Sequence, residues 1–92
     1  MPTSGSSETY NVRITRKAQK ELKKLGHQAR DRITPAIRDL ANDPRPHNCK
    51  KLKGKNDLYR IRKGDYRAIY QVDDENITVL VVRVRHRREA YR

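Results

Sequence analysis

Arginine residues recur at alternate positions in the second half of the chain. Arg60 and Arg62 alternate with apolar residues in the segment 58–62, and Arg67 follows in the segment 65–72. Side chains at positions i and i+2 of a strand share a face, so Arg60 and Arg62 should point the same way. A tight turn between the two segments would bring Arg67 beside them. Guanidinium groups gathered in this way can bind phosphate oxygens through paired hydrogen bonds.

More basic residues follow towards the end of the chain. They are Arg83, Arg85, His86, Arg87 and Arg88, and Tyr91 comes after them. Like charges on one face of a sheet repel each other, so folding stability alone does not explain such a cluster. A solvated face whose charges only keep the protein in solution is the alternative interpretation.

The chain carries no recognisable metal or cofactor site. Its acidic residues fall mainly in predicted turns, its three histidines are scattered, and no zinc spacing or glycine-rich phosphate loop occurs. We therefore predict neither a metal nor a cofactor. RNA can be cleaved without a metal, because its own 2′-hydroxyl group is the nucleophile. Arginine and tyrosine side chains could orient the phosphodiester and stabilise its charged transition state, but arginine stays protonated and is a poor general base.

Composition favours a small basic domain that binds a polyanion. The 92 residues suffice for one domain, and 23 Lys and Arg against 11 Asp and Glu give a formal charge of +12. A nucleic acid fits this charge better than a membrane, because no apolar stretch approaches the roughly 20 residues of a membrane span. No signal-peptide pattern opens the sequence, and the single cysteine, Cys49, excludes an internal disulfide. We therefore expect a cytoplasmic protein.

The first half of the domain reads as one strand and two helices. Residues 1–9 are small and polar and are expected to be a disordered leader before a domain at 10–92. The segment 10–14 alternates as a strand does, and Thr15 can cap the helix that follows. Gly26 suits the end of that helix. A second helix is predicted at about 27–42, where Pro35 should kink it or shift its start.

The second half reads as three strands connected by short turns. Segments 58–62, 65–72 and 77–85 are predicted strands, joined by turns at 63–64 and 73–76. The last segment is apolar on both faces, which is typical of a central strand. The order β-α-α-β-β-β predicts an α+β fold with a helical hairpin packed on a four-stranded, mostly antiparallel sheet.

Several segments together resemble the RelE/ParE superfamily of bacterial toxins. They cover nearly the whole domain: Thr15-Arg16-Lys17-Ala18-Gln19-Lys20-Glu21-Leu22, Lys51-Leu52-Lys53-Gly54, Leu58-Tyr59-Arg60-Ile61-Arg62, Gly64-Asp65-Tyr66-Arg67-Ala68-Ile69-Tyr70-Gln71-Val72 and His86-Arg87-Arg88-Glu89-Ala90-Tyr91-Arg92. The RelE branch implies a ribosome-dependent, metal-independent endoribonuclease that cleaves mRNA and is neutralised by an acidic antitoxin. The catalytic residues that the resemblance implies are Arg60, Arg62, Arg67, Arg87 and Tyr91.

This sequence departs from the family at the first pair of basic residues. The best-studied branch has Lys-x-Lys where this chain has Arg60-Ile61-Arg62. A lysine can act as a base after a shift of its pKa, whereas an arginine is much less suited. The general base is therefore open, with His86 as one candidate and Glu89 as a weaker one.

Lysines elsewhere form a second class of predicted contacts. We expect them to hold RNA backbone without reading bases, and they are Lys17, Lys20, Lys24, Lys50, Lys51, Lys53 and Lys55. The implied partners are a RelB-like acidic antitoxin and the ribosomal A site with its mRNA and ribosomal RNA.

Two other functions fit the sequence less well. The ParE branch implies the same fold and an antitoxin, but inhibition of DNA gyrase without nuclease activity. Its members generally lack the full set of arginines and tyrosine, so the presence of that set favours RelE. A non-catalytic nucleic-acid-binding module would need only the charge.

Overall fold

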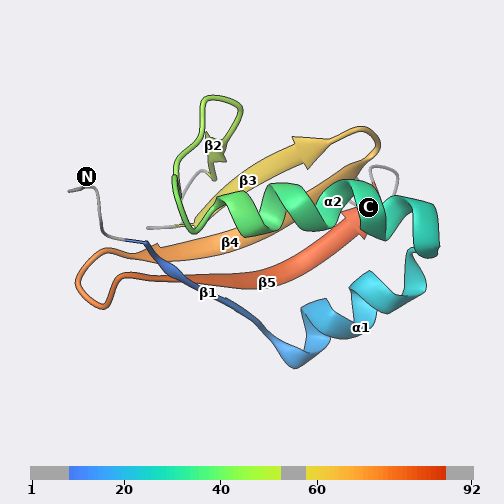
Figure 1. Cartoon of the computed structure of the whole chain (residues 1–92), viewed down its shortest axis with the longest axis horizontal. Helices are drawn as coiled ribbons and strands as arrows, with labels where there is room; N and C mark the ends of the chain where they lie inside the picture. The colour runs from blue at the N-terminus through green and yellow to red at the C-terminus, as the bar shows by residue number, and fades with distance from the viewer. Residues whose placement is uncertain (1–8, 53–57, 87–92) are drawn as a thin grey trace.

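The computed structural model describes residues 9–52 and 58–86, in which two helices and five strands occur. Their bounds are β1 Asn11–Ile14, α1 Arg16–Lys24, α2 His27–Asp39, β2 Lys50–Lys51, β3 Leu58–Lys63, β4 Tyr66–Asp73 and β5 Thr78–His86. The predicted α+β class and the helical hairpin are confirmed (Figure 1). Residues 1–8 of the predicted leader lie outside the described residues.

The sheet has five strands in the described part of the chain, one more than the sequence predicted. Its order is β1-β5-β4-β3-β2, with β1 parallel to β5 and the other neighbours antiparallel. The additional strand is β2, whose Lys50 and Lys51 pair with Arg60 and Tyr59 of β3. The sequence pattern predicts no strand at these two lysines. A two-residue strand has no periodicity to detect, and it exists only because the edge of β3 offers backbone partners.

The helix boundaries follow local signals. Thr15 caps α1 as predicted, and its Oγ1 accepts a hydrogen bond of 3.1 Å from the backbone N–H of Ala18. Gly26 separates the helices with a φ of 84°, a left-handed conformation that favours glycine. Helix α2 begins at His27 as expected, so Pro35 does not shift its start. The helix ends at Asp39, three residues before the predicted end.

The β3–β4 turn lies one residue later than predicted. Lys63 still belongs to β3 and pairs with Tyr66, so the turn consists of Gly64 and Asp65. Gly64 has a φ of 60°, which suits the first central position of a two-residue hairpin turn of type II′. The short turn fixes the register that places β3 against β4.

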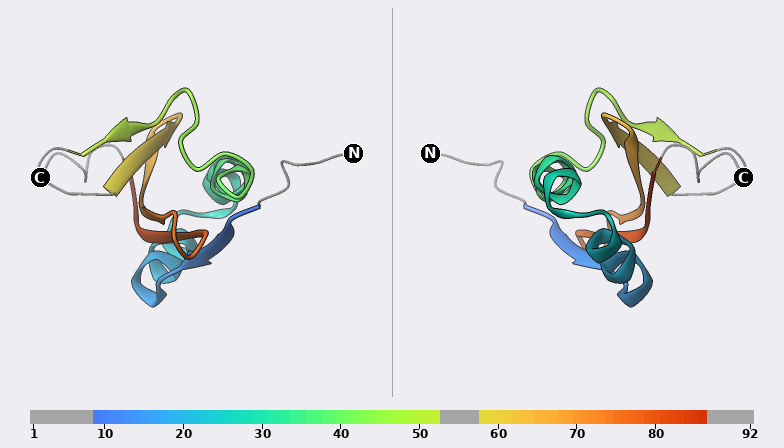
Figure 2. Two further views of the ribbon diagram at one scale, coloured as in Figure 1. Left: turned by 90° about the vertical axis from the view of Figure 1, so that its left-hand side faces the viewer. Right: turned by 90° about the vertical axis from the view of Figure 1, so that its right-hand side faces the viewer.

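The hydrophobic core lies between the helices and one face of the sheet. Helix α2 crosses β3 and β4, and α1 runs beside β5 (Figures 1 and 2). Tyr59 and Tyr70 stack in this core with ring centroids 5.8 Å apart. The other core residues are Ala18, Ile33, Ile37, Leu40, Ile61, Ala68, Val72, Val79, Val81 and Val84.

Strand β5 contains an irregularity that changes which side chains face the core. Ile69 pairs with Arg83, but the next residue, Tyr70, pairs with Val81, so Val82 is an extra residue in β5. Such a bulge reverses the alternation of the residues beyond it. Val79 and Val81 before the bulge and Val84 after it are therefore all buried. Strand β5 lies between β1 and β4, which confirms its predicted central position.

Candidate nucleic-acid interface

Three arginines from three strands form one row across the sheet. Arg67 of β4 lies directly opposite Arg62 of β3 on one side and Arg85 of β5 on the other. Directly opposite residues of an antiparallel pair project from the same face. Their sequence neighbours Ile61, Ala68 and Val84 are buried in the core, so this arginine row (Arg62, Arg67 and Arg85) lies on the sheet face away from the helices.

A second row runs parallel to the first. Arg60 lies opposite Ile69 in β4, and Ile69 lies opposite Arg83 in β5, while Lys50 of β2 extends this row beyond Arg60. The structure thus brings Arg60, Arg62 and Arg67 onto one face, as their alternation predicted. Their roles in catalysis stay a prediction.

Arg67 is the most enclosed member of the group. It is 4% exposed and is the one buried charged side chain among the described residues. A guanidinium group stays protonated, and its charge is costly to bury. Its neighbours across both ladders are also arginines, which repel it. An anion bound at this row would offset the repulsion between the three arginines.

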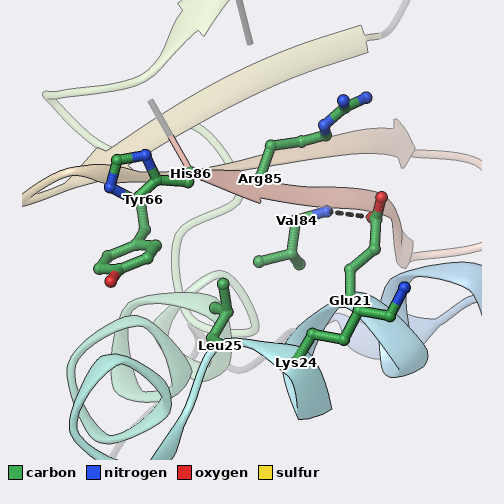
Figure 3. A pocket seen from close by; sticks show the side chains of 7 residues that line it. All are labelled: Glu21, Lys24, Leu25, Tyr66, Val84, Arg85 and His86. Atoms are coloured by element: carbon green, nitrogen blue, oxygen red, sulfur yellow. Dashed lines mark hydrogen bonds between the residues drawn. The ribbon is translucent and has the colours of Figure 1, made fainter. Parts of the chain in front are cut away.

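His86 does not join the arginines. It lies opposite Tyr66, and the two rings meet edge-on with centroids 5.2 Å apart. Figure 3 shows His86 beside Tyr66, while the side chain of Arg85 projects away from Leu25 and Val84. His86 therefore lies on the helix side of the sheet, and this geometry does not support it as the general base. Arg87, Glu89 and Tyr91 lie outside the described residues.

The side of the sheet that carries His86 has a hollow of about 480 Å³. Its lining mixes apolar and charged groups, and consists of Glu21, Lys24, Leu25, Tyr66, Val84, Arg85 and His86 (Figure 3). Glu21 is already engaged here, because its Oε1 accepts a hydrogen bond of 2.8 Å from the Val84 N–H. Its Oε2 accepts one of 3.1 Å from Arg83 Nε.

An ion-pair network that sequence reasoning missed holds the segment before β2. Arg45 donates to Asp74 through Nη2 at 2.8 Å and through Nη1 at 3.3 Å, and to the hydroxyl of Tyr59 through Nε at 2.9 Å. Tyr10 donates to the same carboxylate at 2.7 Å. The hydrogen bonds from Arg45, which have the largest effect, and the one from Tyr10 hold the pKa of Asp74 below its ordinary value. The network fixes the chain that leads into β2 and β3.

The predicted RNA-contacting lysines fall into two separate groups. Lys17, Lys20 and Lys24 follow one another at intervals of three and four along α1, so they form one exposed stripe. Lys50 and Lys51 are exposed on β2, at the opposite edge of the sheet from β1. Lys53 and Lys55 lie outside the described residues.

Residues 9–52 and 58–86 contain no group of three or more side chains placed to hold a metal ion. Neither of the helices described here is long and apolar enough to cross a membrane.

Comparison with known proteins identifies the family of this chain. A model described as the ParE toxin of type II toxin-antitoxin system, parDE, matches residues 12–91. The chain belongs to the RelE/ParE toxin superfamily.

Individual relatives place this superfamily member in the RelE-like branch. It is 36% identical over 86 residues to the mRNA interferase toxin RelE of Escherichia coli strain K12, covering 89% of this chain and 90% of that protein. It is 33% identical over 84 residues to the toxin RelG of Mycobacterium tuberculosis, covering 90% and 97%.

Solved structures agree with this placement of the RelE-like chain. The archaeal RelE-RelB complex from Pyrococcus horikoshii OT3 is similar with a TM-score of 0.76 at 32% identity, over 86% of this chain and 96% of that chain. The isolated E. coli RelE toxin is similar with a TM-score of 0.75 at 33% identity, over 84% and 83%. The predicted fold and family are confirmed.

Sequence reasoning missed Arg85 as a member of the row in this RelE-like domain. Regular alternation along 77–85 would place Arg83 and Arg85 on the same face as Val79 and Val81, towards the core. The bulge at Val82 reverses this and places both arginines on the sheet face away from the helices, called the open face below. No residue type in the segment signals the bulge, because it arises from pairing with β4.

Proposed function

We propose that this chain is the toxin of a type II toxin–antitoxin system and a ribosome-dependent, metal-independent endoribonuclease that cleaves mRNA. The gathering of Arg60, Arg62 and Arg67 on one face of the sheet is the observation that carries the proposal. Similarity to proteins named mRNA interferase over most of the chain supports it. The catalytic set of the proposal is completed by Arg87 and Tyr91.

The proposed reaction uses the nucleophile that RNA supplies. The 2′-oxygen attacks the adjacent phosphorus, the bond from phosphorus to the 5′-oxygen breaks, and a 2′,3′-cyclic phosphate and a 5′-hydroxyl end result. The 2′-hydroxyl gives its proton to water, and the leaving 5′-oxygen takes one from water. Arg62 and Arg67 would bind the non-bridging oxygens as their negative charge increases. This binding is stronger in the transition state than in the ground state, so it lowers the barrier.

Positioning completes the proposed mechanism. Tyr91 would stack on or hydrogen-bond to the substrate near the cleaved bond, and Arg87 would add a further positive charge. His86 is not assigned the role of base, because its ring lies against Tyr66 on the other side of the sheet. Alignment of the 2′-oxygen with the leaving oxygen then depends on the ribosome-bound mRNA and the arginines together.

The charge of the chain supports the proposed partners. With a formal charge of +12, the toxin would bind the ribosomal A site and its mRNA and ribosomal RNA through phosphate contacts by its lysines. A RelB-like acidic antitoxin would neutralise it, as suggested by neighbours that were solved as RelE-RelB complexes. Because its proposed target is the translating ribosome, the toxin would act in the cytoplasm.

Primer extension on mRNA in a translating extract tests the proposal. Cleavage inside codons that requires ribosomes is the expected result. Cleavage of naked RNA would instead indicate a ribosome-independent nuclease. The ParE description of the matching family model favours gyrase inhibition as the second candidate, so a supercoiling assay with purified gyrase belongs beside it. Inhibition of gyrase without RNA cleavage would overturn the proposal.

A further inference from the structure

Strand β5 presents two arginines to the open face of the sheet, and their surroundings differ. Arg83 forms an ion pair with Glu21 of α1, in which its Nε donates to Glu21 Oε2 at 3.1 Å. The second oxygen of Glu21 accepts the N–H of Val84 at 2.8 Å, so both oxygens of this carboxylate are used. The Glu21 side chain is 20% exposed, which strengthens its interaction with Arg83 compared with a fully solvated pair. The charge of Arg83 is thereby compensated within the protein.

None of the ion pairs within residues 9–52 and 58–86 includes Arg85. It lies directly opposite Arg67 and continues the row that begins at Arg62. In Figure 3 its side chain extends to the side of β5 away from Leu25 and Val84, while Glu21 reaches the backbone of Val84. Arg85 is therefore the β5 arginine whose charge is available to a ligand on the open face.

The spacing of the row suits a phosphodiester. Adjacent strands are about 4.8 Å apart, so the backbones that carry Arg62 and Arg85 lie on either side of Arg67 at about that distance. Long guanidinium side chains from two flanking strands can converge over the central strand. A phosphate bound at this row could then be reached from the β5 side as well as from the β3 side, with bidentate hydrogen bonds from each fork.

We propose that Arg85 is a further phosphate-binding residue of this site, and that Glu21 is a positioning residue that keeps Arg83 out of the arginine row. This inference rests on the proposed RNA-cleaving function. Arg85 contacts the non-bridging oxygens of the scissile phosphate and stabilises their increasing charge. Glu21 prevents Arg83, two residues before Arg85 on the same face, from repelling it and competing for the phosphate.

The matched pair Arg85→Gln and Arg83→Gln tests the assignment. Both substitutions remove one charge from the same face of the same strand, and glutamine at position 83 can still donate to Glu21. We expect Arg85→Gln to lower the single-turnover rate of mRNA cleavage on programmed ribosomes by about 100-fold. Arg83→Gln should stay within about twofold of the unmodified protein. An unchanged rate for Arg85→Gln, or equal losses for both variants, would overturn the assignment of Arg85.

A rescue experiment tests the role of Glu21. Glu21→Gln should lower the cleavage rate because it releases Arg83, and adding Arg83→Gln to the same chain should restore most of that rate. A purely structural role predicts no rescue, since the second substitution returns no lost contact. Failure of the double variant to recover would therefore refute the positioning role, with circular dichroism used to confirm that each protein is folded.

Arg67→Gln measured in parallel distinguishes failure of the proposed nuclease activity from failure of the role assigned to Arg85. Loss of cleavage in Arg67→Gln but not in Arg85→Gln leaves the proposed nuclease intact and refutes the inference about Arg85. Full cleavage by both variants refutes the arginine site as a whole. Thermal midpoints and antitoxin binding, measured on the same preparations, should be unchanged in Arg85→Gln.

Discussion

Arg45 and Asp74 join two segments that are 29 residues apart through two hydrogen bonds, of 2.8 and 3.3 Å. Arg45 lies in the loop after α2, and Asp74 lies in the turn between β4 and β5. The Arg45 guanidinium also lies 5.2 Å from the centre of the Tyr59 ring. This pair fixes the loop before β2 to the far end of the hairpin that carries Arg67 and Arg85.

Asp74→Asn should make the protein less stable at neutral pH. The folded-state pKa of Asp74 is lowered, so its contribution is present above the unfolded pKa of about 3.9 and is lost as the pH falls through the folded value. Thermal melts from pH 7 down to pH 2 should show a lower midpoint for the variant at pH 7 and convergence of the two proteins in strong acid. A difference that persists at the lowest pH would mean that the carboxylate charge is not responsible.

Tyr70→Phe should lower the free energy of unfolding by about 1–2 kcal/mol. The Tyr70 side chain is fully buried, and its hydroxyl donates to the carbonyl oxygen of Pro44 at 2.7 Å. Burial raises the pKa of this hydroxyl above its ordinary value, so it stays protonated and able to donate. Phenylalanine keeps the ring but leaves the Pro44 carbonyl without this donor. Urea denaturation measures the loss, and Tyr66→Phe, at a half-buried ring, should cost much less.

Arg67→Ala and Arg67→Gln should both abolish growth arrest on induced expression, while the protein still folds and binds its antitoxin. Both substitutions remove the central charge of the arginine row. Glutamine fills more of this buried position than alanine does, so it separates loss of the charge from the effect of a cavity. Arg87→Ala should give the same loss of growth arrest. Arg38→Ala, at an exposed site on α2, is the control and should remain toxic. Retained toxicity in both Arg67 variants would contradict the assigned site.

Ribosome binding should weaken steeply with salt, and the lysine stripe of α1 should account for part of the slope. Replacing Lys17, Lys20 and Lys24 with glutamine should reduce the slope of log K against log salt by up to about 3, because each phosphate contact contributes about one counterion. Titrations of labelled toxin with ribosomes at several salt concentrations measure this. A slope unaffected by the triple substitution would exclude α1 from the RNA contact.

The sequence by itself determined the helical hairpin and the three-stranded meander. Thr15 and Gly26 mark helix ends through local hydrogen bonding and a left-handed backbone, and these depend on neighbouring residues alone. The same holds for Arg60 and Arg62, since alternation along one strand needs no knowledge of the rest of the chain. Together with the short turn that follows, this was enough to bring Arg67 next to them.

Only the tertiary structure decided the remainder of the site. The bulge at Val82 results from the pairing of β5 with β4, and it alone turns Arg85 towards Arg67 instead of towards the core. His86, one residue further along, consequently lies on the helix side of the sheet beside Tyr66. Strand β2 likewise exists because β3 has an edge to pair with. These features depend on backbone hydrogen bonds between distant segments, which residue type and spacing within one segment do not encode.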